Sequence, residues 1–225
     1  MKAMKNKLIL LLIAAFLFSI EAYPQTKNTV KLPEPKKKGS ISVEEALQNR
    51  RSKRKFKQRL LTMDEVSQLL WAAYGVTKDG FFKTTPSAGS MYGLEVYLVA
   101  GMVNGLQAGI YKYKPKSHEL ELVREGDFRY ELADAALAQL FVEKAPATVV
   151  IAAVYERLEN KYTEKGIPYA HLEAGHAGQN IYLQATAMNL GTCAVSSFVP
   201  ADIKKLINMP INEEPVYLFP VGEPE

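Results

Sequence analysis

The spacing of apolar residues along the chain predicts five helices. The first begins after Ser42, because Glu45 three residues later completes the pattern of a capping box. The second follows Thr62 and ends before Gly75, a residue that suits a helix C-terminus. Apolar residues three and four positions apart predict the remaining helices, over residues 128–140, about 169–189 and 200–207.

Runs that alternate or are apolar throughout predict the strands. Residues 146–153 contain no charge and are expected to form a fully buried central strand. Residues 155–168 are charged and aromatic with no steady period, so we expect a mobile or covering segment there. The mixture predicts an α+β domain with a central sheet flanked by helices. The other strands are expected at 94–100, 109–113, 120–123 and 215–221.

The first 40 residues differ from the rest of the chain. Residues 1–22 combine three Lys with the apolar run Leu8–Phe18, the layout of a secretory signal peptide and too short to span a bilayer comfortably. Residues 23–40 contain three Pro and five Lys, which predicts a flexible basic linker. We therefore expect a folded domain over 41–225 in an exported, periplasmic protein. The alternative is an uncleaved membrane anchor at the N-terminus.

Charge and cysteine content narrow the class of protein. The formal charge of +4 is smaller than a nucleic-acid binder usually carries. The single cysteine, Cys193, has no partner for a disulfide or a cysteine metal site, and we expect it to be a small buried residue. His171 and His176 lie about 140° apart on a helix, unlike the pair of a zinc helix. We therefore expect neither a metal ion nor a nucleic-acid partner.

Three segments have the composition of a ligand site. Residues 50–56 read RRSKRKF, and guanidinium groups beside a Ser hydroxyl suit a phosphate, although such a charge run also suits a solvated surface. Residues 84–93 read TTPSAGSMYG, where small residues let the backbone approach a planar ligand, although such turns are common before strands. The helix around 173–180 carries small residues that permit close packing, either in the core or across a dimer axis.

Together these segments resemble the FMN-dependent nitroreductase family, particularly its SagB-type dehydrogenase branch. The resemblance runs from about Ile41 to Gly222 and rests on four pieces in order, RRSKRKF, PSAGSMYGLEVYLV, EAGHAGQNIYLQATAMNLGT and PVYLFPVGEP. It implies a nitroreductase-like fold with a mostly antiparallel central sheet. It also implies an interlocked homodimer with FMN bound at the subunit interface.

The resemblance implies a role for residues on both sides of that interface. Arg50 and Ser52 would contact the FMN phosphate, Arg51 the phosphate or the ribityl chain, and Arg54 the N1/O2 edge of the ring. Residues of the first loop would reach the same flavin from the other subunit, namely Pro86, Ser87, Ala88, Ser90 and Met91. Residues after the long helix would lie over the ring near N5, namely Val195, Ser196 and Ser197.

No side chain is expected to be catalytic in the strict sense, because the cofactor supplies the reactivity. Tyr162 and Tyr169 are candidates for a segment that covers the substrate, with plain packing as the alternative. Two features depart from many relatives. Ser occupies positions where relatives often carry Asn, near residue 90, or an acid, near 196 or 197, and the chain ends in acids instead of a basic Lys-x-Arg. FMN would then bind less tightly, or cations near 50–59 would contribute more.

The resulting functional hypothesis is an FMN-dependent oxidoreductase of nitroreductase type. It would transfer a hydride or electrons between a donor, NAD(P)H in the usual case, and an electron-poor small molecule such as a nitroarene or quinone. Export conflicts with NAD(P)H as donor. The alternatives are therefore an oxidase or dehydrogenase acting on an exported substrate without NAD(P)H, a non-catalytic periplasmic flavin-binding protein, and a degenerate member that binds no flavin.

Overall fold

The computed structural model describes residues 29–225, so the predicted signal peptide at 1–22 and the first part of the predicted linker lie outside the described residues. Its centre is a seven-stranded sheet in which every neighbouring pair is antiparallel. In spatial order the strands are β1 (Thr29–Lys31), β6 (Glu119–Glu125), β5 (Gly109–Lys114), β4 (Leu94–Ala100), β7 (Ala147–Ala153), β9 (Glu214–Gly222) and β8 (Gly191–Thr192).

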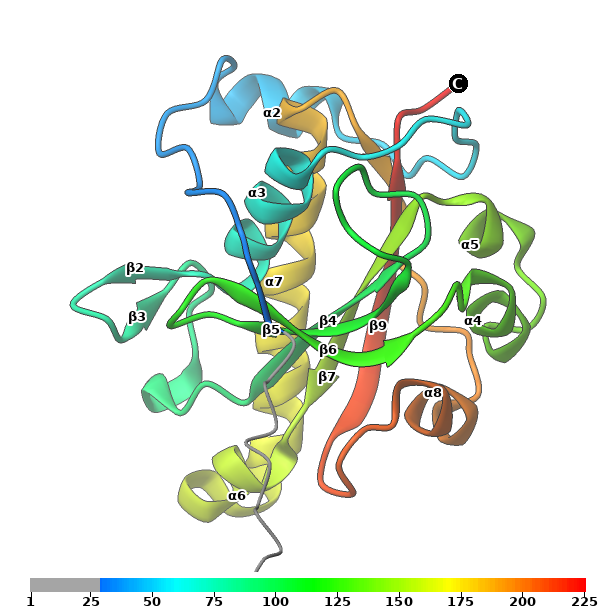
Figure 1. Ribbon diagram of the computed structural model, residues 1–225. Coiled ribbons are helices and arrows are strands. Elements are labelled where there is room, and N and C mark those ends of the chain that lie inside the picture. The colour runs from blue at the N-terminus through cyan, green and yellow to red at the C-terminus, as the bar shows by residue number, and fades with distance from the viewer. Residues whose placement is uncertain (1–28) are drawn as a thin grey trace, which may run out of the picture.

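Helices cover both faces of this sheet (Figure 1). One face is covered by α3 (Met63–Tyr74) and α7 (Gly166–Ala187), and the other by α4 (Arg129–Ala135) and α8 (Pro200–Ile207). This confirms the predicted α+β fold with a central antiparallel sheet. The shorter elements pack at the margins, namely α2 (Val43–Asn49), α5 (Leu140–Lys144), α6 (Tyr155–Tyr162) and the hairpin of β2 (Val76–Lys78) and β3 (Phe82–Lys83).

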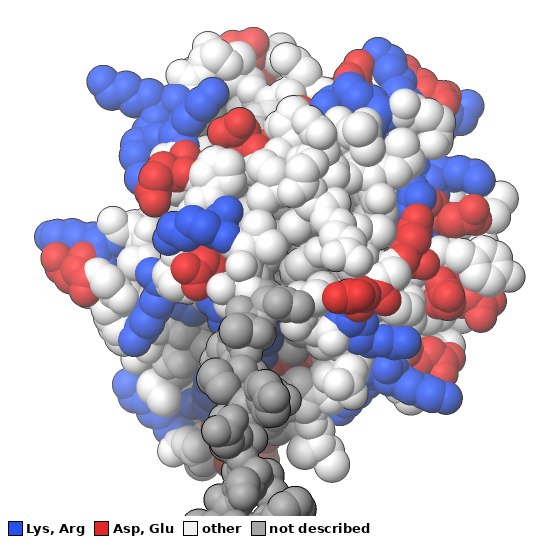
Figure 2. All heavy atoms as spheres, viewed as in Figure 1, with Lys and Arg blue, Asp and Glu red and all other residues white. Residues whose placement is uncertain are grey.

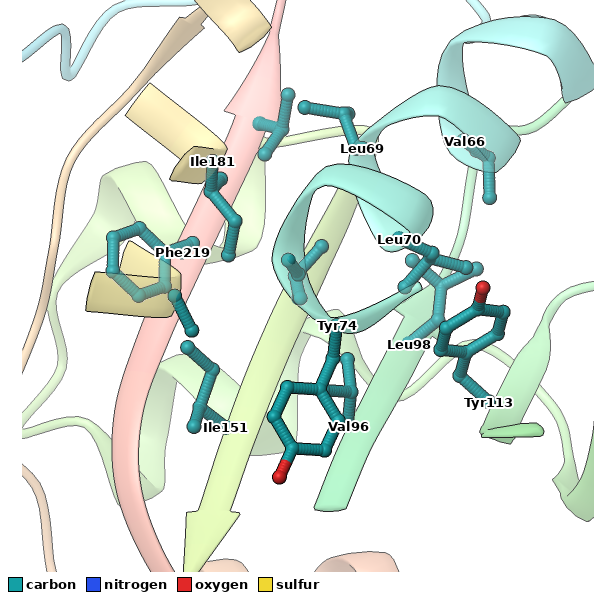
Figure 3. Close-up of a cluster of buried hydrophobic side chains, with 14 of the residues drawn as sticks. Val66, Leu69, Leu70, Tyr74, Val96, Leu98, Tyr113, Ile151, Ile181 and Phe219 are labelled. Carbon is teal, nitrogen blue, oxygen red and sulfur yellow. The ribbon is translucent and has the colours of Figure 1, made fainter. Parts of the chain in front are cut away.

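Alternation along the strands explains why the molecule has two cores. On β4, Val96 and Leu98 point toward α3 and α7, as Figure 3 shows, whereas Tyr97 and Val99 belong to the cluster under α4 and α8. Every residue of β7 is buried, as predicted for a central strand covered on both sides. Each fully buried Val, Leu or Ile side chain in these cores contributes about 1.5–3 kcal/mol through burial.

The flexible linker predicted over residues 23–40 does not hold at residues 29–33, which are part of the folded domain. Strand β1 pairs with β6, with Val30 opposite Leu120, and Leu32 is buried in the core. The carbonyl of Pro33 accepts a hydrogen bond from the hydroxyl of Ser67 on α3 (2.5 Å). A short edge strand needs few apolar residues. Because Lys and Pro surround β1 in the sequence, its alternating pattern was too weak to predict a strand.

The segment at residues 155–168, which we expected to be mobile or covering, has regular helical structure. It contains helix α6, which buries Leu158, followed by a 3-10 turn (Thr163–Lys165) and the start of α7. A Cβ at Gly166 would come within 2.5 Å of the backbone nitrogen of Glu159, so this glycine permits the tight connection. Helix α6 has one narrow apolar stripe. Charged and aromatic residues on either side of that stripe make its helical period difficult to detect in the sequence.

The helix predicted over residues 128–140 is split into α4 and α5. Leu137 and Ala138 between them have positive φ values of 59° and 56°. The carbonyl of Ala135 accepts a hydrogen bond from the backbone nitrogen of Val199 (2.8 Å) instead of continuing the helix. This tertiary contact overrides the local helical pattern.

The face shown in Figure 2 carries basic and acidic side chains side by side. Within residues 29–225, no helix combines the length and apolar character that a membrane crossing requires.

Candidate functional site

The basic segment that follows α2 lies along the end of the sheet. Ser52 forms a parallel bridge with Thr192 on β8, and the backbone nitrogen of Lys53 donates to the Thr192 carbonyl (2.9 Å). Phe56 is buried and bridges Pro224 after β9. These contacts fasten residues 50–56 to the last two strands and set the direction of their side chains.

Tyr182 on α7 joins this segment to the chain after β8. Its hydroxyl lies 3.0 Å from the hydroxyl of Ser52 and accepts a hydrogen bond from the backbone nitrogen of Ala194 (2.8 Å). The guanidinium of Arg50 lies 5.1 Å from the centre of the Tyr182 ring, within range of a cation–π contact. One tyrosine therefore holds two of the predicted cofactor segments together.

The cations of this segment have the chemistry of a phosphate site. Within residues 29–225, none of them forms an ion pair with a carboxylate, although Arg51 donates to the carbonyls of Gln48 (3.0 Å) and Arg50 (2.7 Å) at the end of α2. The hydroxyl of Thr192 is buried and has no hydrogen-bond partner among the described residues. Unpaired guanidinium groups beside hydroxyls fit a phosphate monoester.

The acidic C-terminus makes its ion pairs elsewhere. Glu223 pairs with Lys57 (2.5 Å) and with Arg59 (2.6 Å), and these partners lower the pKa of its carboxyl, chiefly through the hydrogen bond from Lys57. Arg59 also pairs with Glu65 (2.8 Å). The acid therefore engages cations at 57 and 59 and leaves those at 50–55 available for an anion.

The segment after β8 lies beside the same group. Val195 is buried and exchanges two backbone hydrogen bonds with Leu218 (2.8 and 2.9 Å), while Ser196 and Ser197 are exposed. The Ser197 carbonyl accepts from the side chain of Gln139 (3.0 Å). Two residues after Gln139, the centre of the Phe141 ring lies 5.8 Å from the guanidinium carbon of Arg54. Arg54 and Ser197 thus border the same short stretch before and within α5.

The loop at 86–91 is held by a buried acid on α7. Glu173 accepts hydrogen bonds from the hydroxyls of Ser87 and Tyr74, each at 2.6 Å. The Ser87 hydroxyl also accepts from the backbone nitrogen of Tyr92 (2.8 Å). Burial, together with the neighbouring Glu173, raises the pKa of Tyr74. The sequence pattern did not predict a role for Glu173. The pattern that could have indicated one is a carboxylate followed by the small residues Ala174 and Gly175 on a helix that packs on the core.

The other residues of this loop are more loosely placed. Ala88 and Met91 pack partly on the core, whereas Pro86 and Ser90 are exposed. Gly89 and Ser90 have positive φ values of 55° and 56°, a conformation that favours Gly or Asn over Ser. The loop therefore has a defined backbone with few covering side chains.

Tyr162 and Tyr169 lie next to this loop. Their rings meet edge to face with centroids 5.1 Å apart. A Cβ at Gly89 would come within 2.4 Å of the Tyr162 hydroxyl and 2.6 Å of the Lys161 amine. The predicted covering residues and the predicted interface loop thus form one cluster.

Within one chain, this cluster and the basic segment lie at different places on α7. The loop contacts Glu173, whereas the basic segment contacts Tyr182. Nine residues of helix separate these positions by about 13–14 Å. In the single chain, the two candidate cofactor segments therefore lie apart.

Comparison with known proteins identifies the family. The model of the nitroreductase family matches residues 47–223. The chain belongs to the nitroreductase family.

Its similarity to individual relatives extends over most of the chain. It is 43% identical over 182 residues to the protein named "Putative nitroreductase MJ1384" of Methanocaldococcus jannaschii, which covers 81% of this chain and 91% of that relative. A crystal structure of a protein named "putative nitroreductase" from Ralstonia eutropha JMP134 superposes with a TM-score of 0.77, at 28% identity, over 88% of this chain and 90% of the other. The fold is also that of the NADPH:FMN oxidoreductase of Vibrio harveyi in complex with NAD+, with a TM-score of 0.59, 19% identity and coverage of 81% and 69%.

The hairpin of β2 and β3 is a further element of this nitroreductase family member that the sequence pattern did not predict. Residues Val76–Lys83 form the hairpin of β2 and β3 beside the 86–91 loop. The Asp79–Gly80 pair is a turn signal that points to this hairpin.

Proposed function

We propose that this protein is an FMN-dependent oxidoreductase that works as a homodimer with one flavin at each subunit interface. The observation that carries the proposal is the group of unpaired cations and hydroxyls at residues 50–54, joined through Tyr182 to residues 194–197. Membership of the nitroreductase family supports it, as does the shared fold with an enzyme that is named for its reaction with FMN.

The residues present would hold the parts of FMN differently. Arg50 and Ser52 would bind the phosphate, and Arg51 the phosphate or the ribityl chain. Arg54 would place its charge near the N1/O2 edge, where a fixed cation favours the negative charge of the reduced ring. The segment Val195–Ser197 would lie over the ring near N5. Bound FMN would supply hydride and electron transfer, and the chain's own residues would bind and orient it.

The exposed face of α7 supports a homodimer. Leu172 is 61% exposed, and a Cβ at Gly175 would meet no atom within 4 Å, so this face has room for a second copy. Two α7 helices that pack antiparallel about a two-fold axis near residues 177–178 would bring Glu173 of one chain beside Tyr182 of the other. The loop residues Pro86, Ser87, Ala88, Ser90 and Met91 would then complete the flavin site of the second copy.

Flavin binding is tested by a double variant, Arg50→Ala with Arg54→Ala. Loss of two ligands of the anion should reduce FMN retention at least about tenfold, because each charge-assisted contact contributes more than a neutral hydrogen bond. The visible flavin bands of the purified protein report retention, and circular dichroism reports folding. The matched control is Lys116→Ala with Lys205→Ala, which removes the same charge from exposed positions elsewhere. A wild type that remains colourless after addition of FMN would contradict the proposal.

The proposal extends to export and to the branch of the family. We propose export through residues 1–22 and assignment to the SagB-type dehydrogenase branch, on the segments quoted above. Because NAD(P)H is scarce outside the cytoplasm, an oxidase or dehydrogenase reaction without NAD(P)H is the second candidate. Stopped-flow mixing with a panel of donors and acceptors separates the two: rapid bleaching of the flavin by NADPH would favour the usual donor, and no turnover with any pair would leave a flavin-binding protein.

A further inference from the structure

Residues 29–38, which we call the strap, cross the domain from the edge of the sheet to α3. Beside β1, the backbone nitrogen of Leu32 donates to the His118 carbonyl (3.1 Å). At the other end, Lys36 exchanges two backbone hydrogen bonds with the side chain of Gln68 on α3 (2.8 and 3.1 Å). Figure 1 shows the strap in blue, running from the sheet past α3. Leu32 is its single buried side chain, so the strap can detach without unfolding the core.

A buried histidine lies under the strap and contacts three elements. His118 is 9% exposed and ends the turn between β5 and β6. Its Nε2 lies 3.0 Å from the carbonyl oxygen of Pro33 in the strap and 2.8 Å from the hydroxyl of Ser67 on α3. Its Nδ1 lies 2.8 Å from the hydroxyl of Tyr113 on β5. One imidazole therefore joins the strap to the helix and to the sheet.

The hydrogen bonds around this ring require a neutral imidazole. The Ser67 hydroxyl donates to the Pro33 carbonyl (2.5 Å), so Nε2 carries the proton and donates, while Nδ1 accepts from Tyr113. Burial raises the pKa of Tyr113, and its hydroxyl makes no second hydrogen bond within residues 29–225. A proton on Nδ1 would therefore leave a buried hydroxyl without its acceptor, which is unfavourable.

The charged groups that act on His118 belong to the strap itself. Burial lowers the pKa of His118, and the amines of Lys31 and Lys37 lower it further. The hydrogen bond with the Pro33 carbonyl and the charge of Glu34 act in the opposite direction and are outweighed. Among the described residues, α3 and β5 contact the ring through neutral hydroxyls alone. The attached strap therefore favours the neutral ring, and a protonated ring would repel two of its lysines.

We propose that the strap is released by acid: protonation of His118 detaches residues 29–38 from α3 and from the turn between β5 and β6. Once water reaches the ring, its pKa returns to the ordinary value of about 6.5. The released state then binds a proton more readily than the attached state. The strap is consequently most stable above about pH 6.5 and loses stability as the pH falls below that value.

Release would change how the domain connects to the residues before position 29. Ten freed residues span at most about 33–36 Å, so the domain could move further from whatever holds its N-terminus. The departure of β1 would also leave β6 as the edge of the sheet, with backbone groups open to another strand. Neither consequence depends on flavin binding.

The test measures the attachment of the strap at pH 7.5 and pH 5.5. Amide hydrogen exchange of Leu32 and Lys36, corrected for the intrinsic effect of pH, gives their protection factors. The amine of Lys37 lies 4.2 Å from the ring centre of Trp71, the only tryptophan of the sequence, so its fluorescence reports release independently.

Two histidine variants separate the effect of this ring from a general effect of acid. His118→Asn removes the titrating group, and Asn tolerates the positive φ of 52° at this position. His176→Asn is the matched control, because it removes an exposed imidazole from α7.

We expect the protection of both strap amides to fall about threefold to tenfold between pH 7.5 and pH 5.5 in the wild type and in His176→Asn. The amides of β7 should keep their protection, and His118→Asn should lose the pH dependence. A wild-type strap equally protected at both pH values, an equal fall in His118→Asn, or an equal fall in β7 would overturn the proposal.

A third variant covers the case in which His118→Asn detaches the strap at both pH values. Glu34→Gln removes the charge that favours the protonated ring in the attached state. It should leave the protection at pH 7.5 unchanged and lower it at pH 5.5 below that of the wild type. The same change at both pH values, or none at either, would show that His118 does not control the strap.

Discussion

At the scale of single residues, the buried carboxylate of Glu173 fixes the position of the 86–91 loop. It is 1% exposed and accepts from two hydroxyls that lie 86 and 99 positions away in the chain. Ser87 belongs to the loop and Tyr74 to the end of α3. A buried acceptor with two donors stabilises the loop only while all three groups are present, because an unpaired buried hydroxyl loses its hydration without compensation.

Replacement of this acid should therefore destabilise the fold. We expect Glu173→Ala to lower the free energy of unfolding by about 2–4 kcal/mol, since it leaves the buried Tyr74 hydroxyl and the part-buried Ser87 hydroxyl without their acceptor. Glu173→Gln keeps the shape and one acceptor and should cost about half as much. Urea denaturation followed by tryptophan fluorescence measures both, with the exposed Glu156→Ala as control. Equal stability of Glu173→Ala and the control would refute the role of this carboxylate.

At the scale of elements, α2 and α3 differ in how completely their N-termini are capped. Thr62 accepts from the backbone nitrogen of Glu65 (3.1 Å), and the Glu65 side chain accepts from the backbone nitrogen of Thr62 (2.8 Å), which completes the capping box of α3. At α2, Ser42 accepts from Glu45 (3.1 Å), but no reciprocal bond is formed. The capping box predicted at Ser42 is thus half formed, and the complete one is at the second helix.

The cap of α3 should consequently contribute more to stability than that of α2. We expect Thr62→Ala to lower the free energy of unfolding by about 1–2 kcal/mol, because α3 carries core residues such as Leu70 and Tyr74. Ser42→Ala on the short, exposed α2 should cost less than about 1 kcal/mol. Thermal or urea unfolding of the two variants measures the difference. A larger loss of unfolding free energy for Ser42→Ala than for Thr62→Ala would contradict the prediction.

At the scale of the whole molecule, one chain places the two candidate cofactor segments at different points on α7, about nine residues of helix apart. A second copy packed antiparallel along α7 would bring the 86–91 loop of one chain beside the basic segment of the other. Cofactor binding would then require the dimer. In that case the exposed face of α7 would be a functional surface.

A charge on that face should separate the subunits and release the flavin together. Leu172→Glu is expected to convert the dimer to monomer and to reduce FMN retention at least about tenfold, because a buried unpaired carboxylate costs several kcal/mol. Light scattering coupled to gel filtration gives the mass, and absorbance gives the flavin content. Leu137→Glu is the matched control, since Leu137 is 60% exposed against 61% for Leu172 and lies beyond α4. A dimeric Leu172→Glu protein with full flavin would contradict this arrangement.

Local pattern was sufficient where one element carries the signal alone. The apolar run of β7, the helix at Pro200–Ile207 and the caps of α2 and α3 follow from neighbouring residues, and the structure confirms their places. The pattern failed where tertiary contacts decide. Residues 29–33 are ordered by β6 and by Ser67, and the 128–140 helix is interrupted where Ala135 bonds to Val199.

The sequence by itself determined the family, the α+β class and the composition of the candidate ligand segments, because these depend on residue type and short-range order. Only the tertiary structure decided that Arg54 and Ser197 border the same stretch of chain, that Glu173 holds the 86–91 loop, and that Glu223 engages Lys57 and Arg59. Such pairs are distant in sequence, and their contact depends on how helices pack on the sheet, which no local periodicity encodes.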